Sequence, residues 1–156
     1  MLTAFHIRLV RALSLENAEF ILIGGHAALV YGSGRTTGDM DLFVRPDRKN
    51  GENIIRAFLA LGLDCGDLVP EDFEGNLILS FGLEPDGVDI INRLKGSSFE
   101  EISENVGQIE IEAGFAIPVM DARDLLKEKR LLQRQGIKGL SDQIDILSIE
   151  AWLKGR

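Results

Sequence analysis

Short apolar runs and longer stretches with helical periodicity alternate along the chain. Apolar runs that end at Gly, Asp or Pro predict strands, whereas apolar residues recurring every three or four positions predict helices. The predicted strands cover residues 19–23, 39–44, 76–81, 87–91 and 108–120, the last with a bend at Gly114. The predicted helices cover residues 26–31, 48–62, 97–106, 121–136 and 141–155, the last capped by Ser141. This mixture predicts an α+β fold with a mixed sheet.

The first residues have the pattern of an amphipathic helix rather than of a signal peptide. Leu2, Phe5, Leu9 and Leu13 recur at helical spacing, and two arginines interrupt the apolar run. No segment is long and apolar enough to span a bilayer, so no membrane association is expected. The single cysteine, Cys65, excludes an intramolecular disulfide and fits a reducing compartment. We therefore expect a cytoplasmic protein.

The chain has 156 residues, which fits one domain, and its 45% content of hydrophobic residues is enough for a core. We expect the domain to span residues 1–156, with a core of about 17–120 and C-terminal helices in 121–154. The net charge of -8 argues against broad, sequence-independent binding of nucleic acid. Residues 121–138 carry six basic and three acidic side chains, so this segment is +3 and the remainder -11. A polyanion should bind near that segment.

Two aspartates stand one residue apart in the predicted strand of residues 39–44. Side chains two apart on a strand point the same way, so Asp39 and Asp41 share one face, with backbones roughly 6–7 Å apart. Two such carboxylates repel unless a cation lies between them, and Mg²⁺ takes carboxylate oxygens together with waters or phosphates. An EF-hand is excluded because apolar residues occupy its ligand positions. The alternative is an exposed strand end with two solvated aspartates.

A third carboxylate, Asp89, interrupts the apolar strand of residues 87–91 in the same way. If the two strands are neighbours, the three acids can converge. Three carboxylates can hold two metal ions roughly 3.5–4 Å apart, which activates a nucleophile and stabilises a leaving pyrophosphate. The alternative for Asp89 alone is a charge at a strand end.

Gly24 and Gly25 lie between a predicted strand and a predicted helix. Such a turn lets backbone N–H groups approach phosphate oxygens; the alternative is a tight turn with no ligand. The sequence around it matches neither a Walker A loop nor a Rossmann fingerprint. His26 follows directly, and it either contacts substrate or is a helix-end histidine without chemistry.

The helix predicted over residues 121–136 has a basic stripe. Arg123, Lys127, Arg130 and Arg134 recur at i, i+4, i+7 and i+11 and share one face. A solvated face explains such a stripe, and so does contact with a triphosphate or an RNA backbone. The pattern leaves both readings open.

These features, in this order, resemble the nucleotidyltransferase superfamily with the DNA polymerase β-type fold. The family pattern is a hydrophobic strand ending in Gly-Gly or Gly-Ser, followed by an Asp-x-Asp or Asp-x-Glu strand and a later lone acid. Here 13 residues separate Gly25 from Asp39. The fold that the resemblance implies is a mixed sheet with helices packed on one face and a helical C-terminal segment.

Within that superfamily, the chain is similar to AbiEii-type proteins, many of which are toxins of toxin–antitoxin pairs. Their Arg-x-Thr-x-Asp-x-Asp run is matched by Arg35 and Thr37 together with the two aspartates. Their later helix lysine is matched by Lys127. Their Lys-Asp-x-x-Asp motif is matched by Asp142 and Asp145, although Leu-Ser stands where the family often has a lysine.

The resemblance implies a metal-dependent nucleotidyltransferase, which moves an NMP from a nucleoside triphosphate to an acceptor hydroxyl. Three residues would hold Mg²⁺ or Mn²⁺ and be catalytic: Asp39, Asp41 and Asp89. Lys127 would be catalytic as well. The substrate-binding residues would be Gly24, Gly25, Arg35, Thr37, Asp142 and Asp145.

The acceptor stays open between an RNA 3′ end, a protein side chain and a small molecule. A toxin role would add a small cognate partner protein. One rival hypothesis is a catalytically weak or inactive binding module, such as an antitoxin or a nucleotide sensor. Another is a structural α/β domain whose acids coincide by chance.

Overall fold

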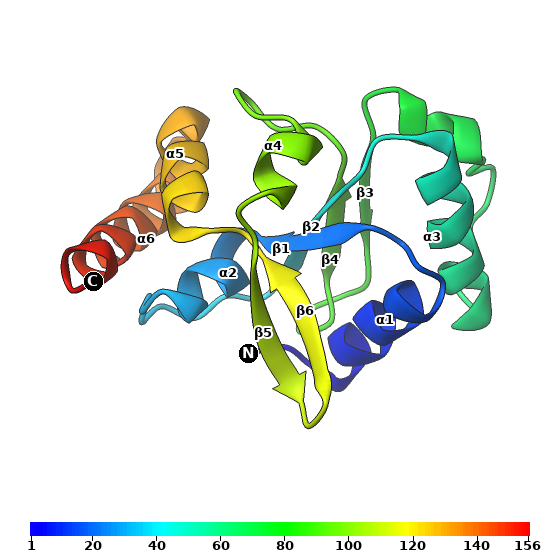
Figure 1. Ribbon diagram of the computed structural model, residues 1–156, viewed down its shortest axis with the longest axis horizontal. Helices are drawn as coiled ribbons and strands as arrows, with labels where there is room; N and C mark the ends of the chain where they lie inside the picture. Colours follow the sequence, from blue (N-terminus) through cyan, green and yellow to red (C-terminus); the bar gives the residue numbers. More distant parts are fainter.

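One mixed sheet of six strands forms the centre of the molecule, in the order β3-β4-β2-β1-β6-β5 (Figure 1). The computed structural model describes residues 1–156. The strands are β1 (Phe20–Ile23), β2 (Met40–Val44), β3 (Ile78–Phe81), β4 (Val88–Ile91), β5 (Gly107–Glu112) and β6 (Phe115–Val119). β2 runs parallel to β4, and β1 runs parallel to β6, while the other neighbours are antiparallel. The predicted α+β fold with a mixed sheet is confirmed.

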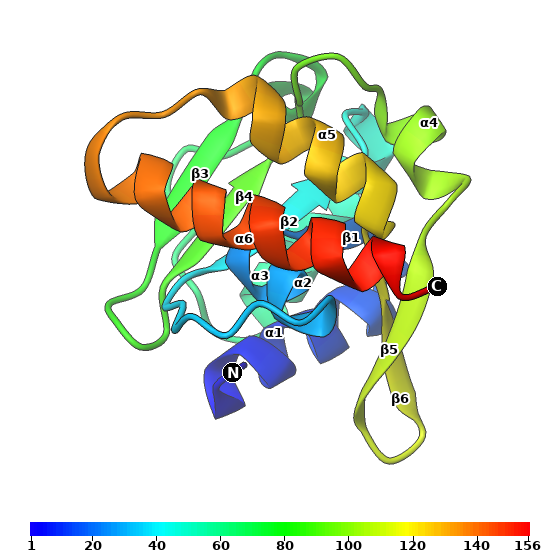
Figure 2. The same ribbon diagram turned by 90° about the vertical axis from the view of Figure 1, so that its left-hand side faces the viewer.

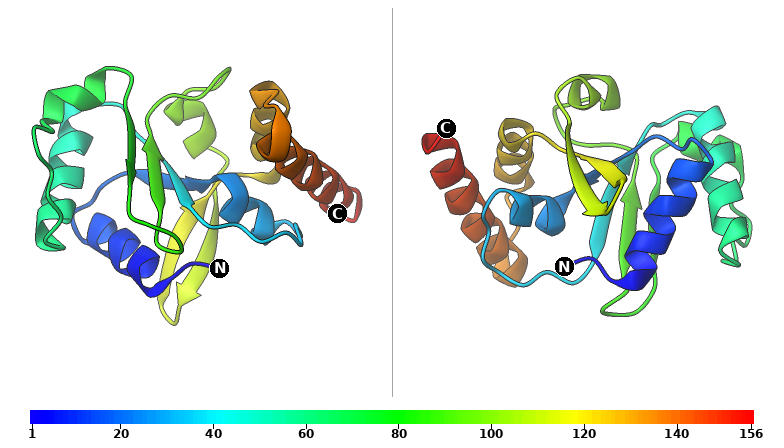
Figure 3. Two further views of the ribbon diagram at one scale, coloured as in Figure 1. Left: turned by 180° about the vertical axis from the view of Figure 1, so that it is seen from behind. Right: turned by 60° about the horizontal axis from the view of Figure 1, so that its bottom comes forward.

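Six helices and one 3-10 turn surround the sheet. They are α1 (Ala4–Leu15), α2 (Gly24–Val30), α3 (Arg48–Ala60), η1 (Pro70–Glu74), α4 (Phe99–Ser103), α5 (Ala122–Leu132) and α6 (Gly136–Lys154). α1 and α3 lie on one side of the molecule, and α5 and α6 lie on the other (Figure 3). Phe58 of α3 packs on Phe81 of β3, whereas Phe99 of α4 packs on Phe43 of β2, on the opposite face.

The alternation of side chains along the central strands separates a core face from a functional face. Met40 and Leu42 of β2 lie opposite Val88 and Ile90 of β4, and all four side chains are buried. The residues between them face the other way, so this register turns the intervening acids away from the core. One hydrophobic cluster of 32 residues includes side chains from every helix from α1 to α6.

The two C-terminal helices have other limits than the sequence predicts. α5 ends at Leu132, where Gln133 adopts a left-handed φ of 48°, rather than at Gly136. α6 begins at Gly136, so Ser141 lies inside the helix, and the prediction that it caps the helix is wrong. Arg134, in the connection between the two helices, donates two hydrogen bonds to Asp142 of α6. No helix of the molecule is long and apolar enough to cross a membrane.

Candidate functional site

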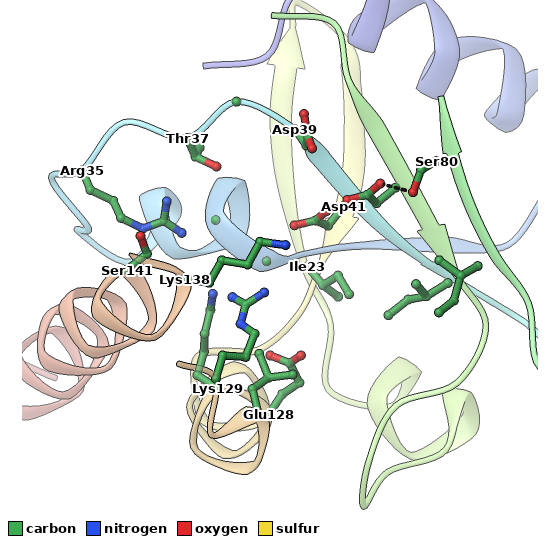
Figure 4. Close-up of a pocket in the computed structure, with 18 of the residues that line it drawn as sticks. Ile23, Arg35, Thr37, Asp39, Asp41, Ser80, Glu128, Lys129, Lys138 and Ser141 are labelled. Carbon is green, nitrogen blue, oxygen red and sulfur yellow. Dashed lines mark hydrogen bonds between the residues drawn. The ribbon is translucent and has the colours of Figure 1, made fainter. Parts of the chain in front are cut away.

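A cavity of about 410 Å³ opens over the functional face of the sheet (Figure 4). Three separate parts of the chain line it: residues 23–41, residues 78–91 and residues 128–141. The first two supply the acidic side chains of the sheet. The third supplies basic side chains from α5, α6 and the connection between them, and Arg35 of the first part joins these. The cavity therefore has an acidic floor and a basic wall.

The three predicted acids lie together on this floor. Asp41 and Asp89 are register partners on the parallel strands β2 and β4, which run roughly 4.8 Å apart. Asp39 precedes β2 and lines the same cavity. The hydroxyl of Ser80, the partner of Asp89 on β3, donates a 2.6 Å hydrogen bond to Asp89 Oδ1. The two strands are therefore neighbours, and all three acids line one cavity.

Asp41 carries most of the electrostatic strain of the cluster. The pKa of its carboxyl is raised to about 7, chiefly by burial and also by the carboxylates of Asp89 and Asp39, while Lys129 opposes the shift. Burial without a compensating positive charge makes the ionised form of a carboxyl group less stable. A cation at the floor would relieve that cost.

The carboxylates of the floor are the ligand type that a hard divalent cation prefers, but their oxygens are not arranged around a common point. Asp39, Asp41 and Asp89 offer carboxylate oxygens, the ligands that Mg²⁺ prefers. No three acidic, histidine or cysteine side chains converge into a formed metal centre. Side-chain rotation would be required to bring the three carboxylates onto an ion.

The glycines next to the floor make room for functional side chains. Gly24 has a φ of 69°, and a Cβ atom there would collide with Oδ2 of Asp41. A Cβ atom at Gly25 would collide with Oγ1 of Thr37 and would lie 2.8 Å from Nη2 of Arg35. The Gly-Gly pair lines the cavity, and its absent side chains let the acid, the threonine and the arginine approach the start of α2.

The basic wall is organised by two buried carboxylates of α6. Asp145, which is fully buried, accepts hydrogen bonds from Ser33 Oγ at 2.8 Å and from Nε and Nη2 of Arg35, both at 2.8 Å. Lys129 Nζ lies 3.0 Å from Asp145 Oδ2 and 3.1 Å from Asp142 Oδ1. Arg134 makes two further bonds to Asp142, at 2.6 and 2.7 Å.

These contacts correct the expected role of the second motif. Burial alone would raise the pKa of both aspartates, but bonds to Arg134 and Lys129 lower the pKa of Asp142, and bonds to Arg35 and Lys129 lower that of Asp145. Neither aspartate lines the cavity. They orient basic side chains, whereas the resemblance to AbiEii-type proteins implied that they bind substrate directly.

Lys127 does not point into the cavity, so the prediction that it is a catalytic residue is wrong. Its amine donates to the carbonyl of Gly96 at 3.0 Å and to Ser97 Oγ at 3.2 Å, in the loop before α4. Two residues further along α5, Lys129 is buried and lines the cavity instead. Two residues rotate a helix by roughly 200°, which places the two lysines on opposite sides.

The sequence reasoning missed Lys129, Lys138 and Glu128, all of which line the cavity (Figure 4). A signal for Lys129 is present, because it follows Ala122 and Leu125 in the apolar phase of α5, and all three are buried. Burial raises the pKa of Glu128, and its Oε2 atom is buried without a hydrogen-bond partner. Glu128 therefore adds a buried carboxylate to the wall of the cavity, and Glu84 is a further acidic residue of the lining.

The side chains of the predicted basic stripe contact different parts of the molecule. Arg134 lines the cavity, whereas Arg130 pairs with Glu150 at the surface. The stripe as a whole does not face the site. His26 lies outside the cavity lining and is buried, with Nε2 3.3 Å from the carbonyl of Gly38. This position matches the second of the two alternatives for His26, a helix-end histidine that does not contact substrate.

A scan of the chain against models of known protein families finds no match. A search among curated proteins finds no significant relative either. The functional conclusion therefore rests on the chemistry of the site. An acidic floor opposite a basic wall can bind a divalent cation and a polyphosphate together, since each half attracts one component.

Proposed function

We propose that the protein is a metal-dependent nucleotidyltransferase, which moves an NMP from a nucleoside triphosphate to an acceptor hydroxyl. One observation carries this proposal: the acids of β2 and β4 face the basic side chains of α5 and α6 across one cavity. A magnesium triphosphate contains both the cation and the anion that such a cavity attracts. A cavity of about 410 Å³ falls within the usual range of roughly 300–1,000 Å³ for small-molecule sites.

The basic wall would bind the phosphates. Lys138 lines the cavity and makes no salt bridge, so its amine is free for a phosphate oxygen. Arg35 and Arg134 also line the cavity, each oriented by a buried carboxylate of α6. Lys129 is fixed between both of those carboxylates, and it contributes positive charge close to Asp41.

The acidic floor would hold the cation and prepare the acceptor. Asp39 and Asp41 would hold Mg²⁺ or Mn²⁺, with Asp89 beside them. When bound, the ion supplies charge stabilisation to the phosphoryl oxygens during displacement. Asp89 would accept the proton of the acceptor hydroxyl as its oxygen bonds to the α-phosphorus and the bond to the pyrophosphate breaks. The hydrogen bond from Ser80 orients Asp89 for this task.

An aliphatic ledge next to the acids would support the base or the sugar. Ile78 and Ile91 are register partners on β3 and β4 and line the cavity. Ile78 is 69% exposed, so its side chain is accessible to a ligand in the cavity. No aromatic residue lines the cavity, so stacking is not available. We expect the ledge to bind the base by apolar contact, with weak discrimination between bases.

Thermal melting with metal and nucleotide tests the binding part of the proposal. Mg²⁺ or Mn²⁺ should raise the melting temperature, because a ligand of the native state stabilises it. A nucleoside triphosphate should add a further rise only with the metal present. Asp41→Asn should abolish the metal-dependent rise, and Asp67→Asn, at an exposed acid outside the cavity, should retain it.

Transfer is tested with each of the four ribonucleoside triphosphates labelled at the α-phosphate. The candidate acceptors are a mixture of RNAs, a protein extract and small hydroxyl compounds. Wild type should release pyrophosphate and label an acceptor, whereas Asp41→Asn should do neither. If wild type and Asp41→Asn respond identically to metal and to every nucleotide, the proposed function is wrong.

The open arrangement of the carboxylates favours a second candidate, a binding module with little or no catalysis. No three acidic, histidine or cysteine side chains of the molecule are grouped closely enough to hold a metal ion as they stand. This candidate predicts that metal and nucleotide stabilise the protein together while no acceptor becomes labelled. The two experiments above therefore separate the candidates.

A further inference from the structure

α6 has apolar side chains on two opposite faces, and only one of these faces is covered. The inner face packs into the molecule through Asp142, Asp145, Ile146 and Ile149, all of which are buried. The outer face carries four large apolar side chains that are exposed: Ile137 at 82%, Leu140 at 66%, Ile144 at 46% and Leu147 at 66%. We call these four residues the α6 seam. Figure 2 shows α6 running across the outside of the molecule, with α5 beside it.

The spacing of the α6 seam is that of a coiled coil. Its members follow one another at intervals of three, four and three residues, the a and d positions of a heptad repeat. Such a narrow seam packs best against a second helix that carries the same seam. Helices that are apolar all round are normally buried on all sides, so the exposed face of α6 lacks a partner within this chain.

The residues beside the α6 seam do not oppose contact with an identical helix. On one side lie Ser141 and Ser148, which are uncharged. On the other side lie Gln143 and Glu150, and the charge of Glu150 is matched by Arg130 of the same chain at 3.0 Å. The chain as a whole carries a net charge of -8, so a nearly neutral apolar face is where two copies can approach without strong repulsion.

We propose that the α6 seam is the interface of a homodimer, in which it packs against the same seam of a second copy. Two identical helices related by a two-fold axis make a self-complementary contact. Burial of both seams with their flanking residues removes about 1,000 Å² of total surface from water, the lower end of the range for specific interfaces. The contact covers two heptads, which are already folded in each copy, so we expect a reversible dimer of about micromolar affinity.

Sedimentation velocity of the full chain, from about 1 to 100 μM, tests this inference at the concentrations where a micromolar dimer forms and dissociates. Leu147→Glu is the disrupting variant. Because the symmetry doubles each substitution, it should weaken the dimer by about 100-fold or more, which leaves a monomer over this range. Leu15→Glu is the matched control, since Leu15 is 77% exposed on α1, away from the α6 seam. It should dimerise as wild type does.

Circular dichroism should show the same helix content for both variants, because each replaced side chain is exposed. A wild-type protein that remains monomeric at about 100 μM overturns the proposal, whether or not another protein covers the seam. A dimer that Leu147→Glu leaves intact overturns it as well. The proposal does not depend on the proposed activity, since it concerns a surface outside the acidic floor.

Discussion

Replacement of Asp145 by Asn should destabilise the protein far more than loss of a surface ion pair. The Asp145 carboxylate is fully buried and accepts bonds from Ser33, Arg35 and Lys129. Asn keeps the size of the side chain but removes the charge. Lys129, which is itself buried, then keeps only Asp142 as an anionic partner.

The size of this loss in stability follows from the positive charge of Lys129, which stays buried after its partner is neutralised. Removal of one member of a buried ion pair costs about 3–5 kcal/mol, because the other charge is left uncompensated. Asn retains part of the hydrogen bonding, so we expect the lower end, about 3 kcal/mol. For a chain of this length that corresponds to a fall in melting temperature of roughly 6–12 °C. Adding Lys129→Met to Asp145→Asn should recover part of the loss, because the uncompensated charge is then absent.

Urea and thermal denaturation at neutral pH measure this difference. Glu150→Gln is the control, since its pair with Arg130 is partly exposed and should contribute at most about 1 kcal/mol. The folded protein lowers the pKa of Asp145 below its ordinary 3.8, so its contribution is complete above that pH and is lost as the pH falls through the folded pKa. The gap between wild type and Asp145→Asn should therefore narrow only below about pH 3.8. A variant that melts within 1 °C of wild type at pH 7 would refute this account of the basic wall.

Three further predictions concern the cavity and its surroundings. Lys138→Ala should weaken calorimetric binding of a non-hydrolysable nucleoside triphosphate with Mg²⁺ by about 10-fold or more, and Lys127→Ala should leave it within about two-fold, because only the first amine faces the cavity. Gly24→Ala should lower the free energy of unfolding, measured in urea, by about 1–3 kcal/mol. Residue 24 has a positive φ, and the added Cβ atom would meet the side chain of Asp41. Equal stability of variant and wild type would contradict this close approach. Burial lowers the pKa of His26 from 6.5 to about 4, so its contribution to stability declines as the pH falls through that window, by about 2 kcal/mol at pH 5. His26→Gln should lack this part of the slope between pH 7.5 and pH 5, and parallel slopes would show that folding does not lower the pKa of the histidine.

The sheet half of the site could be predicted from the sequence because a strand has a period of two. Asp39, Asp41 and Asp89 each interrupt an apolar alternation, and that pattern alone determines the face on which each lies. The neighbouring Gly-Gly pair was also identifiable, as a break between a strand and a helix. What the pattern left open was whether the strands are adjacent, and the structure supplies that pairing.

The part of the site formed by α5 and α6 was harder to predict, because its contacts depend on which face of α5 is buried and on where α6 begins. A basic stripe drew attention to Lys127, whereas the apolar phase of α5 holds Lys129. Asp142 and Asp145 resembled a motif that contacts substrate, yet they are buried against cations from other parts of the chain. Sequence periodicity does not show which buried charge will meet which partner over 110 residues of separation, as Arg35 meets Asp145.

The division of the cavity between a sheet and a pair of later helices has a consequence during synthesis. A nascent chain that has emerged only as far as β6 contains the carboxylates of the floor but none of the cations of α5 and α6. Those carboxylates then face water without a basic wall, and we expect such a chain not to retain a nucleotide. Binding competence would arise when the two helices dock, so a chain synthesised only as far as β6 would be inert however well its sheet has formed.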